Sequence, residues 1–277
     1  MQLLVVGAGE MGRWLADTLA PAVDAAAFAD RDAAAAEAAA REVGRTHETL
    51  STRAVASETG ESFDVVALAV PIPAVGSAVR SHAPNATGAV VDVAGTMETP
   101  LRAMERHAVS EYASFHPLFA PPRAPGRIAY VPGEAGETVG RVRTAMADAG
   151  NEVFETTAAA HDTAMESVQS GAHAAVLAYA LATESVDDRF HTPVSGDLAE
   201  LVRTVTEGDP RVYADIQATF DGADAVADAA AEIAEAAETG DDERFAALFE
   251  RARERVDGLD PRREADEEAE PDGGDRP

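Results

Sequence analysis

Residues 2–12, "QLLVVGAGEMG", decide the fold that we expect for this chain. The apolar run "QLLVV" predicts a short buried strand, and "RWLADTLA", which follows the glycines, has the apolar spacing of a helix. Between them, Gly7, Gly9 and Gly12 fit the pattern G-x-G-x-x-G, which allows a tight turn and lets a pyrophosphate approach the helix N-terminus. The stretch therefore predicts a dinucleotide site at the beginning of an α/β domain.

Strand and helix patterns alternate from this turn to about residue 157. Near-continuous apolar runs at 63–73 and 88–95 predict strands that are covered on both faces. Three further strands are expected in "YASFHPLF", "GRIAYVP" and "NEVFETT", and the alanine-rich helix that begins after Asp30 is expected to end at Gly44. We therefore expect residues 1–157 to form a Rossmann-type α/β domain with a doubly wound parallel sheet.

Only helical patterns follow residue 157. Residues 158–184 predict one long helix that is apolar on most of its faces. We expect an all-helical substrate and dimerisation domain over residues 158–258, and a homodimer formed through it. Residues 259–277 carry almost no apolar side chains, which predicts a disordered acidic tail.

The chain is strongly acidic, with 50 acidic and 22 basic residues and a net charge of −28. This charge argues against nucleic acid or an anionic membrane as a partner and indicates a surface adapted to concentrated salt. All the basic residues are arginine, and the absence of lysine and cysteine excludes Schiff-base chemistry, disulfides and thiolate metal sites. We expect a cytoplasmic protein, because no apolar run reaches the length of a membrane span and no cationic leader is present. No ligand cluster has the spacing of a metal site, so we expect no metal.

Five segments resemble the prephenate dehydrogenases of tyrosine biosynthesis in order and spacing: "LAVPI" (68–72), "VDVAG" (91–95), "FHPLFAP" (115–121), "HDTAMESVQSGAH" (161–173) and "DPRVYADIQ" (209–217). The resemblance covers roughly residues 1–220. It implies a nucleotide-binding domain followed by a helical dimerisation domain. It also implies the NAD-dependent oxidative decarboxylation of prephenate to 4-hydroxyphenylpyruvate.

NAD is the cofactor that we expect. A carboxylate at Asp30, directly after the second strand pattern, would accept hydrogen bonds from the ribose hydroxyls and repel a 2′-phosphate. Arg31 could pair with that phosphate, so NADP stays open. The turn, the acidic position and the segment that matches the family predict these cofactor contacts: Gly7, Gly9, Glu10, Met11, Gly12, Asp30, Arg31, Val70 and Pro71.

His116 is the predicted catalytic residue. It lies where an apolar strand meets a proline-rich loop. The resemblance makes it the group that takes or polarises the proton of the substrate 4-hydroxyl, a role that suits an imidazole titrating near neutrality. The alternative is a structural histidine that satisfies a hydrogen bond at the strand end. For His161 two interpretations stay open: it faces the substrate, or it orients Asp162 and caps backbone.

The resemblance places the substrate near His173 and Tyr213. The family's serine after the strand at 88–95 falls on Gly95 here, and we expect Thr96 to replace it. The two substrate carboxylates need cations, and without lysine only arginine or protonated histidine can supply them. Arg203 is the predicted one.

The family's substrate arginine falls on Thr204, one residue beyond Arg203, and the family's lysine falls on Met97. Arg123 and Arg211 therefore stay open as carboxylate partners. Two other functions also stay open: arogenate dehydrogenase or another small NAD(P)-dependent oxidoreductase of this architecture, such as an imine reductase, and a non-catalytic dinucleotide-binding regulator.

Overall fold

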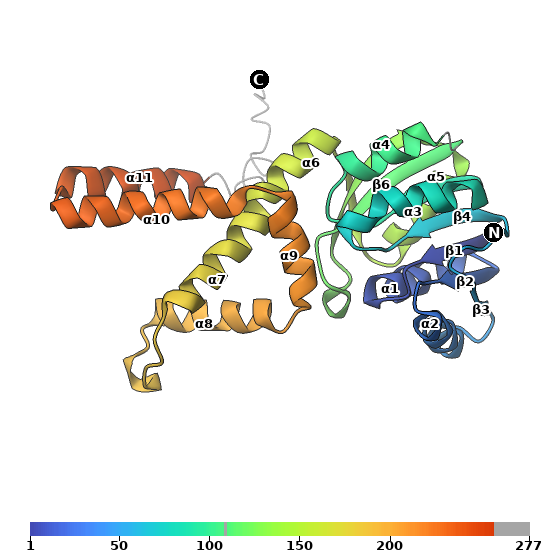
Figure 1. Ribbon diagram of the computed structural model, residues 1–277, viewed down its shortest axis with the longest axis horizontal. Coiled ribbons are helices and arrows are strands. Elements are labelled where there is room, and N and C mark those ends of the chain that lie inside the picture. The colour runs from blue at the N-terminus through green and yellow to red at the C-terminus, as the bar shows by residue number, and fades with distance from the viewer. Residues whose placement is uncertain (108–109, 258–277) are drawn as a thin grey trace, which may run out of the picture. The chain divides into compact units, whose positions relative to one another are not determined.

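The computed structural model describes residues 1–107 and 110–257 (Figure 1). The acidic tail expected at 259–277 lies outside the described residues. Contacts between Cα atoms divide the chain into two compact units, Met1–Gly222 and a second unit that begins at Ala223. The first unit contains the sheet and the helices that meet it.

The first unit is built on an eight-stranded sheet in the order β3-β2-β1-β4-β5-β6-β7-β8. Strands β1 to β6 run parallel, as the doubly wound fold requires. The strand bounds are β1 Gln2–Val6, β2 Ala25–Ala29, β3 Ser51–Val55, β4 Phe63–Leu68, β5 Ala86–Asp92, β6 Glu111–Pro117, β7 Arg127–Glu134 and β8 Glu152–Glu155. The predicted fold class is confirmed, and so are the strands expected around each apolar run.

One edge of the sheet departs from the parallel arrangement. β7 is antiparallel to β6, and β8 is parallel to β7. The loop between β6 and β7 contains only one 3-10 turn, Pro121–Arg123, and a parallel pair needs a longer crossover than this loop provides. β8 keeps the direction of β7 because a full helix, α5 (Glu137–Asp148), connects the two strands.

Helices cover both faces of the sheet. α1 (Glu10–Leu19), α2 (Ala33–Thr46) and α5 pack on one face, where their apolar residues share a core with β1, β2 and β5. α3 (Val75–His82) and α4 (Glu98–Arg106) pack on the other face through Val79 and Met104. Because the sheet is buried on both sides, its central strands are the near-continuous apolar runs seen in the sequence.

Two local predictions fail near the edge strand β3. α2 continues through Gly44 to Thr46, so this glycine does not end the helix. Its role is close packing, because a Cβ there would collide with the Thr52 hydroxyl on β3. The strand itself was not expected, since its residues are only partly buried and form no apolar run.

The helices after residue 157 are α6 Ala158–Met165, α7 Ala172–Ala182, α8 Pro193–Thr206, α9 Pro210–Thr219, α10 Gly222–Thr239 and α11 Asp242–Asp257. A π-helical segment, Glu166–Gly171, joins α6 to α7, so the single long helix that was expected contains a wider turn. The change from strands to helices falls near residue 157, as expected. Contacts between Cα atoms nevertheless place α6 to α9 in the same compact unit as the sheet. The division into domains at this residue stays a prediction.

No helix among residues 1–107 and 110–257 is long and apolar enough to cross a membrane. Within the same ranges, no group of three or more histidine and carboxylate side chains is arranged to hold a metal ion.

Candidate active site

The glycine turn after β1 has the geometry of a dinucleotide site. Gly7 has a positive φ of 99°, and a Cβ there would collide with the carbonyl oxygen of Ala69. A Cβ at Gly12 would collide with the carbonyl of Gly7, so helix and turn approach closely. Gly9 instead faces open space, and as the N-cap of α1 it provides no side chain for the first N–H groups of the helix. These N–H groups can therefore bind an anion.

Asp30 follows β2 and holds the turn in place. One of its carboxylate oxygens accepts a hydrogen bond from the Ala8 N–H at 2.8 Å, and the other accepts one from the Asp32 N–H at 2.9 Å. Each oxygen keeps a lone pair for a ribose hydroxyl. Val70 lies beside Gly7, with its Cγ1 3.3 Å from the position of an added Cβ.

The other predicted cofactor residues flank this turn. Glu10 and Met11 form the first turn of α1, and Pro71 precedes the 3-10 turn Ile72–Ala74. Arg31 is exposed directly after Asp30. Their contacts with a cofactor stay predictions.

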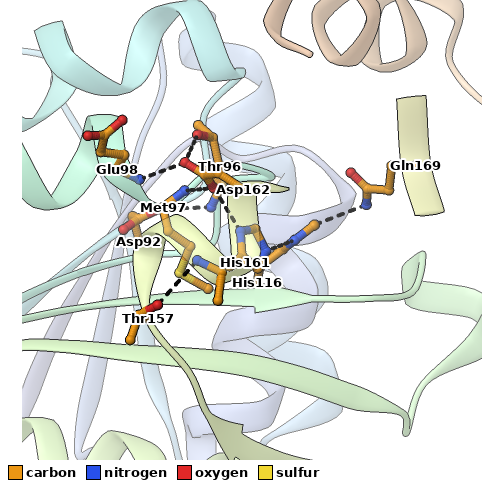
Figure 2. A network of polar contacts seen from close by, with 11 residues as sticks. Asp92, Thr96, Met97, Glu98, His116, Thr157, His161, Asp162 and Gln169 are labelled. Atoms are coloured by element: carbon orange, nitrogen blue, oxygen red, sulfur yellow. Dashed lines mark hydrogen bonds and ion pairs between the residues drawn. The ribbon is translucent and has the colours of Figure 1, made fainter. Parts of the chain in front are cut away.

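A chain of polar contacts connects the carboxyl end of β6 to α6 (Figure 2). His116 Nδ1 lies 2.8 Å from His161 Nε2, and His161 Nδ1 lies 2.8 Å from an oxygen of Asp162. Both histidines are buried, with exposed fractions of 6% and 3%. His161 therefore orients Asp162, as one of the two interpretations left open by the sequence has it, and it contacts His116 as well.

Asp162 also caps α4, which begins without a capping side chain of its own. Its carboxylate accepts hydrogen bonds from the backbone N–H groups of Met97 (2.9 Å) and Glu98 (3.1 Å) and from the Thr96 hydroxyl (3.1 Å). Burial alone would raise the pKa of Asp162, but the hydrogen bonds from His161 and the two backbone groups outweigh it and hold this pKa below its ordinary value. The ionised carboxylate thus fixes both the loop after β5 and the ring of His161.

These contacts determine which nitrogen of His116 carries the hydrogen. Burial first, and then the neighbouring His161, lower the pKa of His116 to about 3, so the ring is neutral and has a single N–H. The amide N–H of Gln169 faces His116 Nε2 at 3.3 Å, so this nitrogen accepts and the single N–H of His116 is on Nδ1, which faces His161 Nε2, while His161 Nδ1 faces the carboxylate of Asp162. His116 Nε2 is then a lone-pair acceptor for a hydrogen bond from a substrate, but the expectation that this imidazole titrates near neutrality is wrong, because burial lowers its pKa to about 3.

Gln169 lies at the far end of this chain, on the π-helical segment (Figure 2). Its side-chain Nε2 is 3.3 Å from His116 Nε2, and this amide N–H is the donor that the lone pair of His116 accepts. The segment is held by Ser170, whose hydroxyl donates to the Phe220 carbonyl at 3.0 Å, and by Gln217, which donates to the Ser170 carbonyl at 2.9 Å. π-helical turns occur frequently at functional sites.

The lone pair of His116 faces the loop after β5. A Cβ added at Gly95 would lie 3.7 Å from His116 Nε2 and 3.4 Å from Ile72 Cδ1. Ile72 follows Val70, which lies beside Gly7, so a continuous set of neighbours leads from the glycine turn to His116. In a parallel sheet the carboxyl ends of β1, β4, β5 and β6 lie on one edge, where doubly wound folds bind their ligands.

The remaining predicted substrate residues lie in three places. Thr96 is buried and donates to Asp162, while His173 on α7 packs edge-on against the ring of Tyr213 on α9, with ring centroids 4.8 Å apart. Burial lowers the pKa of His173. Arg203 is exposed and paired with Glu200 at 2.6 Å.

The two other arginines are also on the surface. Arg211 is paired with Asp209 and its side chain is 91% exposed, and Arg123 is exposed on the loop after β6. Among residues 1–107 and 110–257, none of these three arginines forms a hydrogen bond with His116. Sequence reasoning did not include Asp162 or Gln169 among the site residues, although the spacing of four from His161 through Met165 to Gln169 was a signal for one helix face.

A second buried carboxyl lies one strand away. Asp92 ends β5 and is fully buried, and it accepts a hydrogen bond from the Ala94 N–H at 2.9 Å. Burial raises its pKa to about 8. Its neighbour across the strands is Ser114, also fully buried.

The fold and these contacts define a dinucleotide-binding oxidoreductase with a histidine at the carboxyl edge of its sheet. Residues 26–126 match the family model described as prephenate dehydrogenase, nucleotide-binding domain. A 4-amino-4-deoxyprephenate dehydrogenase of Streptomyces pristinaespiralis is 34% identical over 263 residues, which cover 89% of this chain and 88% of that protein. The chain belongs to the prephenate dehydrogenase family.

Solved structures share the fold along nearly the whole chain. A prephenate dehydrogenase of A. aeolicus has a TM-score of 0.68 at 14% identity, covering 94% of this chain and 98% of that one. The arogenate dehydrogenase of Synechocystis has a TM-score of 0.64 at 16% identity, covering 94% and 100%. At these identities the likeness concerns the fold.

Proposed function

We propose that this protein catalyses the NAD-dependent oxidative decarboxylation of prephenate to 4-hydroxyphenylpyruvate. The observation that carries the proposal is the lone pair on His116 Nε2, which the contacts through His161 to Asp162 direct at the loop after β5. Membership of the family supplies the reaction class. The 4-amino-4-deoxyprephenate dehydrogenase supports the same class of substrate, a cyclohexadiene with a heteroatom at C4.

NAD fits the glycine turn. The free N–H groups at the start of α1 would hold its pyrophosphate, and Asp30 would bind its ribose hydroxyls. The A. aeolicus structure was solved in complex with hydroxyphenyl propionate and NAD+, which supports this cofactor. When bound, NAD supplies the hydride acceptor.

The protein's own residues position and polarise the substrate. His116 Nε2 accepts the hydrogen bond of the 4-hydroxyl, which pushes electrons toward C4 as the C4–H bond breaks. The bond from C1 to its carboxylate then breaks, CO2 leaves, and the ring becomes aromatic. Asp162 stabilises the positive charge that develops on the two imidazoles, since its carboxylate is ionised and within hydrogen-bond distance of His161.

His116→Asn tests this proposal. Purified protein in molar KCl with NAD and prephenate should form NADH and 4-hydroxyphenylpyruvate, and the variant should lower kcat by about two orders of magnitude or more while it binds NAD as before. His107→Asn is the matched control, because this histidine is exposed at the end of α4. Unchanged turnover in His116→Asn would contradict the proposal.

The cation for the substrate carboxylates is proposed to be Arg203, with Arg123 and Arg211 as alternatives. Replacing each by glutamine and measuring the KM for prephenate identifies it. The variant that removes the binding arginine should raise KM at least tenfold, since a hydrogen bond to a charged group is worth about 1.5–3 kcal/mol.

The protein is also proposed to be a cytoplasmic homodimer formed through its helices. Helix α7 consists almost entirely of apolar residues, yet none of them is buried in the single chain. Leu181, Phe190 and Val194 are 88%, 76% and 70% exposed. A second copy that covers these residues would remove a large apolar surface from water. Light scattering should give twice the chain mass, and Leu181→Glu should reduce it to a single chain.

A further inference from the structure

Gln169 was not among the predicted site residues, yet its side chain faces His116 Nε2. Its side-chain amide occupies the hydrogen-bond position on His116 Nε2 that a substrate must take. The carbonyl oxygen of the same amide, Oε1, is buried and has no hydrogen-bond partner among the described residues. A buried acceptor without a partner is unfavourable by about 1–3 kcal/mol, and it marks a place where a ligand can supply the donor.

Two acceptors therefore meet at the reacting end of the site. The first is His116 Nε2, whose lone pair is set by His161 and Asp162. The second is Gln169 Oε1, which is attached to the amide already within 3.3 Å of that nitrogen. A hydroxyl has only one hydrogen and can satisfy one of them, whereas an amino group has at least two and can satisfy both.

The third neighbour adds no hydrogen-bonding side chain. Gly95 has no side chain, and a Cβ added there would lie 3.7 Å from His116 Nε2. No side chain therefore donates a hydrogen bond to His116 Nε2 from this residue. The hydroxyl of Thr96, one residue later, is already donated to Asp162. The groups around His116 Nε2 thus favour a substrate substituent that donates twice.

We propose that Gln169 contacts the substituent on the hydride-donating carbon and that, with His116, it lets this enzyme take a substrate with an amino group at that carbon. The inference rests on the proposed function and extends its substrate class to the C4-amino compound. The reaction balances as for the hydroxyl compound. The C4–H bond breaks with hydride transfer to NAD, the nitrogen lone pair forms the C=N bond, and loss of CO2 from C1 returns those electrons to the ring, which leaves a 4-aminophenyl product.

The Gln169→Leu variant separates the two substrates. The assay compares kcat/KM for prephenate and for its C4-amino analogue, with NAD, in molar KCl. The wild-type protein should oxidise both, with a kcat/KM for the amino compound at least equal to that for prephenate. Gln169→Leu should lower the ratio of amino to hydroxyl kcat/KM by about tenfold or more, because one N–H of the amino group loses its acceptor. Val168→Ala is the control, since Val168 lies on the same π-helical segment and is 51% exposed.

Binding provides a readout that does not depend on turnover. Calorimetric titration with 4-aminophenylpyruvate and 4-hydroxyphenylpyruvate should show the same selective loss in Gln169→Leu. Gly95→Ser should shift the ratio toward the hydroxyl compound, because it adds a hydroxyl beside His116 Nε2 without a steric collision.

The outcomes are distinguishable. If the wild-type protein oxidises neither compound, the proposed function fails. If it oxidises prephenate alone, or if Gln169→Leu changes both substrates equally, the proposed function stands and the role of Gln169 is wrong.

Discussion

Asp162→Asn is the most informative substitution, because one carboxylate both caps a helix and sets the state of the base. The carboxylate accepts four hydrogen bonds, two on each oxygen: His161 and Met97 on Oδ1, Thr96 and Glu98 on Oδ2. Asparagine has the same shape but only one acceptor oxygen. The variant must therefore lose the bonds on one side.

Either orientation of the asparagine is unfavourable. If its oxygen takes the Oδ1 position, its NH2 group faces the Glu98 N–H at the start of α4. If its oxygen takes the Oδ2 position, the NH2 group faces His161 Nδ1 and forces the hydrogen of that ring to Nε2. His116 Nδ1 must then accept, its hydrogen moves to Nε2, and the base has no lone pair for the substrate.

The expected magnitudes follow from these contacts. Hydrogen bonds to a charged group are worth about 1.5–3 kcal/mol and neutral ones about 0.5–1.5 kcal/mol. Losing two bonds and the charge should lower the free energy of unfolding by roughly 2–4 kcal/mol. Turnover should fall by a factor between about 10² and 10⁴ in either orientation, because both lose the negative charge that stabilises the two imidazoles, as for a catalytic histidine whose orienting carboxylate becomes an amide.

The assay is kcat for prephenate together with thermal unfolding, both in molar KCl, with Glu166→Gln as the control. Glu166 is an exposed acidic residue a few positions later, so its variant removes the same charge without touching the network. If Asp162→Asn lowers stability as expected but leaves kcat within about threefold, Asp162 is only a helix cap and the argument on the state of His116 is refuted.

Three further outcomes are expected. The pKa of Asp92 is raised to about 8 in the folded protein, so near neutral pH this carboxyl is protonated in the folded protein and ionised in the unfolded chain. The free energy of unfolding therefore falls as pH rises from about 4 to about 8. Asp92→Asn should remove a loss on the order of 3–4 kcal/mol, seen as a flatter dependence of the unfolding free energy on pH between pH 5 and pH 7.5. Gly222→Ala should lower the unfolding free energy by about 1–3 kcal/mol and reduce kcat/KM, because the added Cβ would collide with the backbone of Glu166 and Gly171 in the π-helical segment. Gly196→Ala is the control, because its Cβ would lie in open space. This variant should leave the unfolding free energy and kcat/KM unchanged or slightly improved. Transfer from molar to about 0.01 M KCl should lower the melting temperature, since the screening length grows from about 3 Å to about 30 Å and the net charge of −28 then repels itself; an unchanged melting temperature would contradict adaptation to salt.

The local signals in the sequence were sufficient for the parts of the fold that obey local rules. Gly7 and Gly12 are required by a turn whose backbone leaves no room for a Cβ, and such a need is visible in the residue type alone. The central strands were predictable because burial on both faces requires continuous apolar residues. β3 was missed because an edge strand is only half covered and carries no such run.

The sequence by itself determined the fold class, the dinucleotide turn and the place of His116 near the end of a strand, because each depends on residue types and spacings that are adjacent along the chain. Only the tertiary structure decided that His161 and Asp162 complete the chain from His116, which pairs residues 45 positions apart. It also decided that Gln169 covers the base from a widened helical turn. Hydrogen bonds between distant segments depend on how strand and helix pack. A pattern of residue types along one segment does not specify the distance between its side chains and those of another segment.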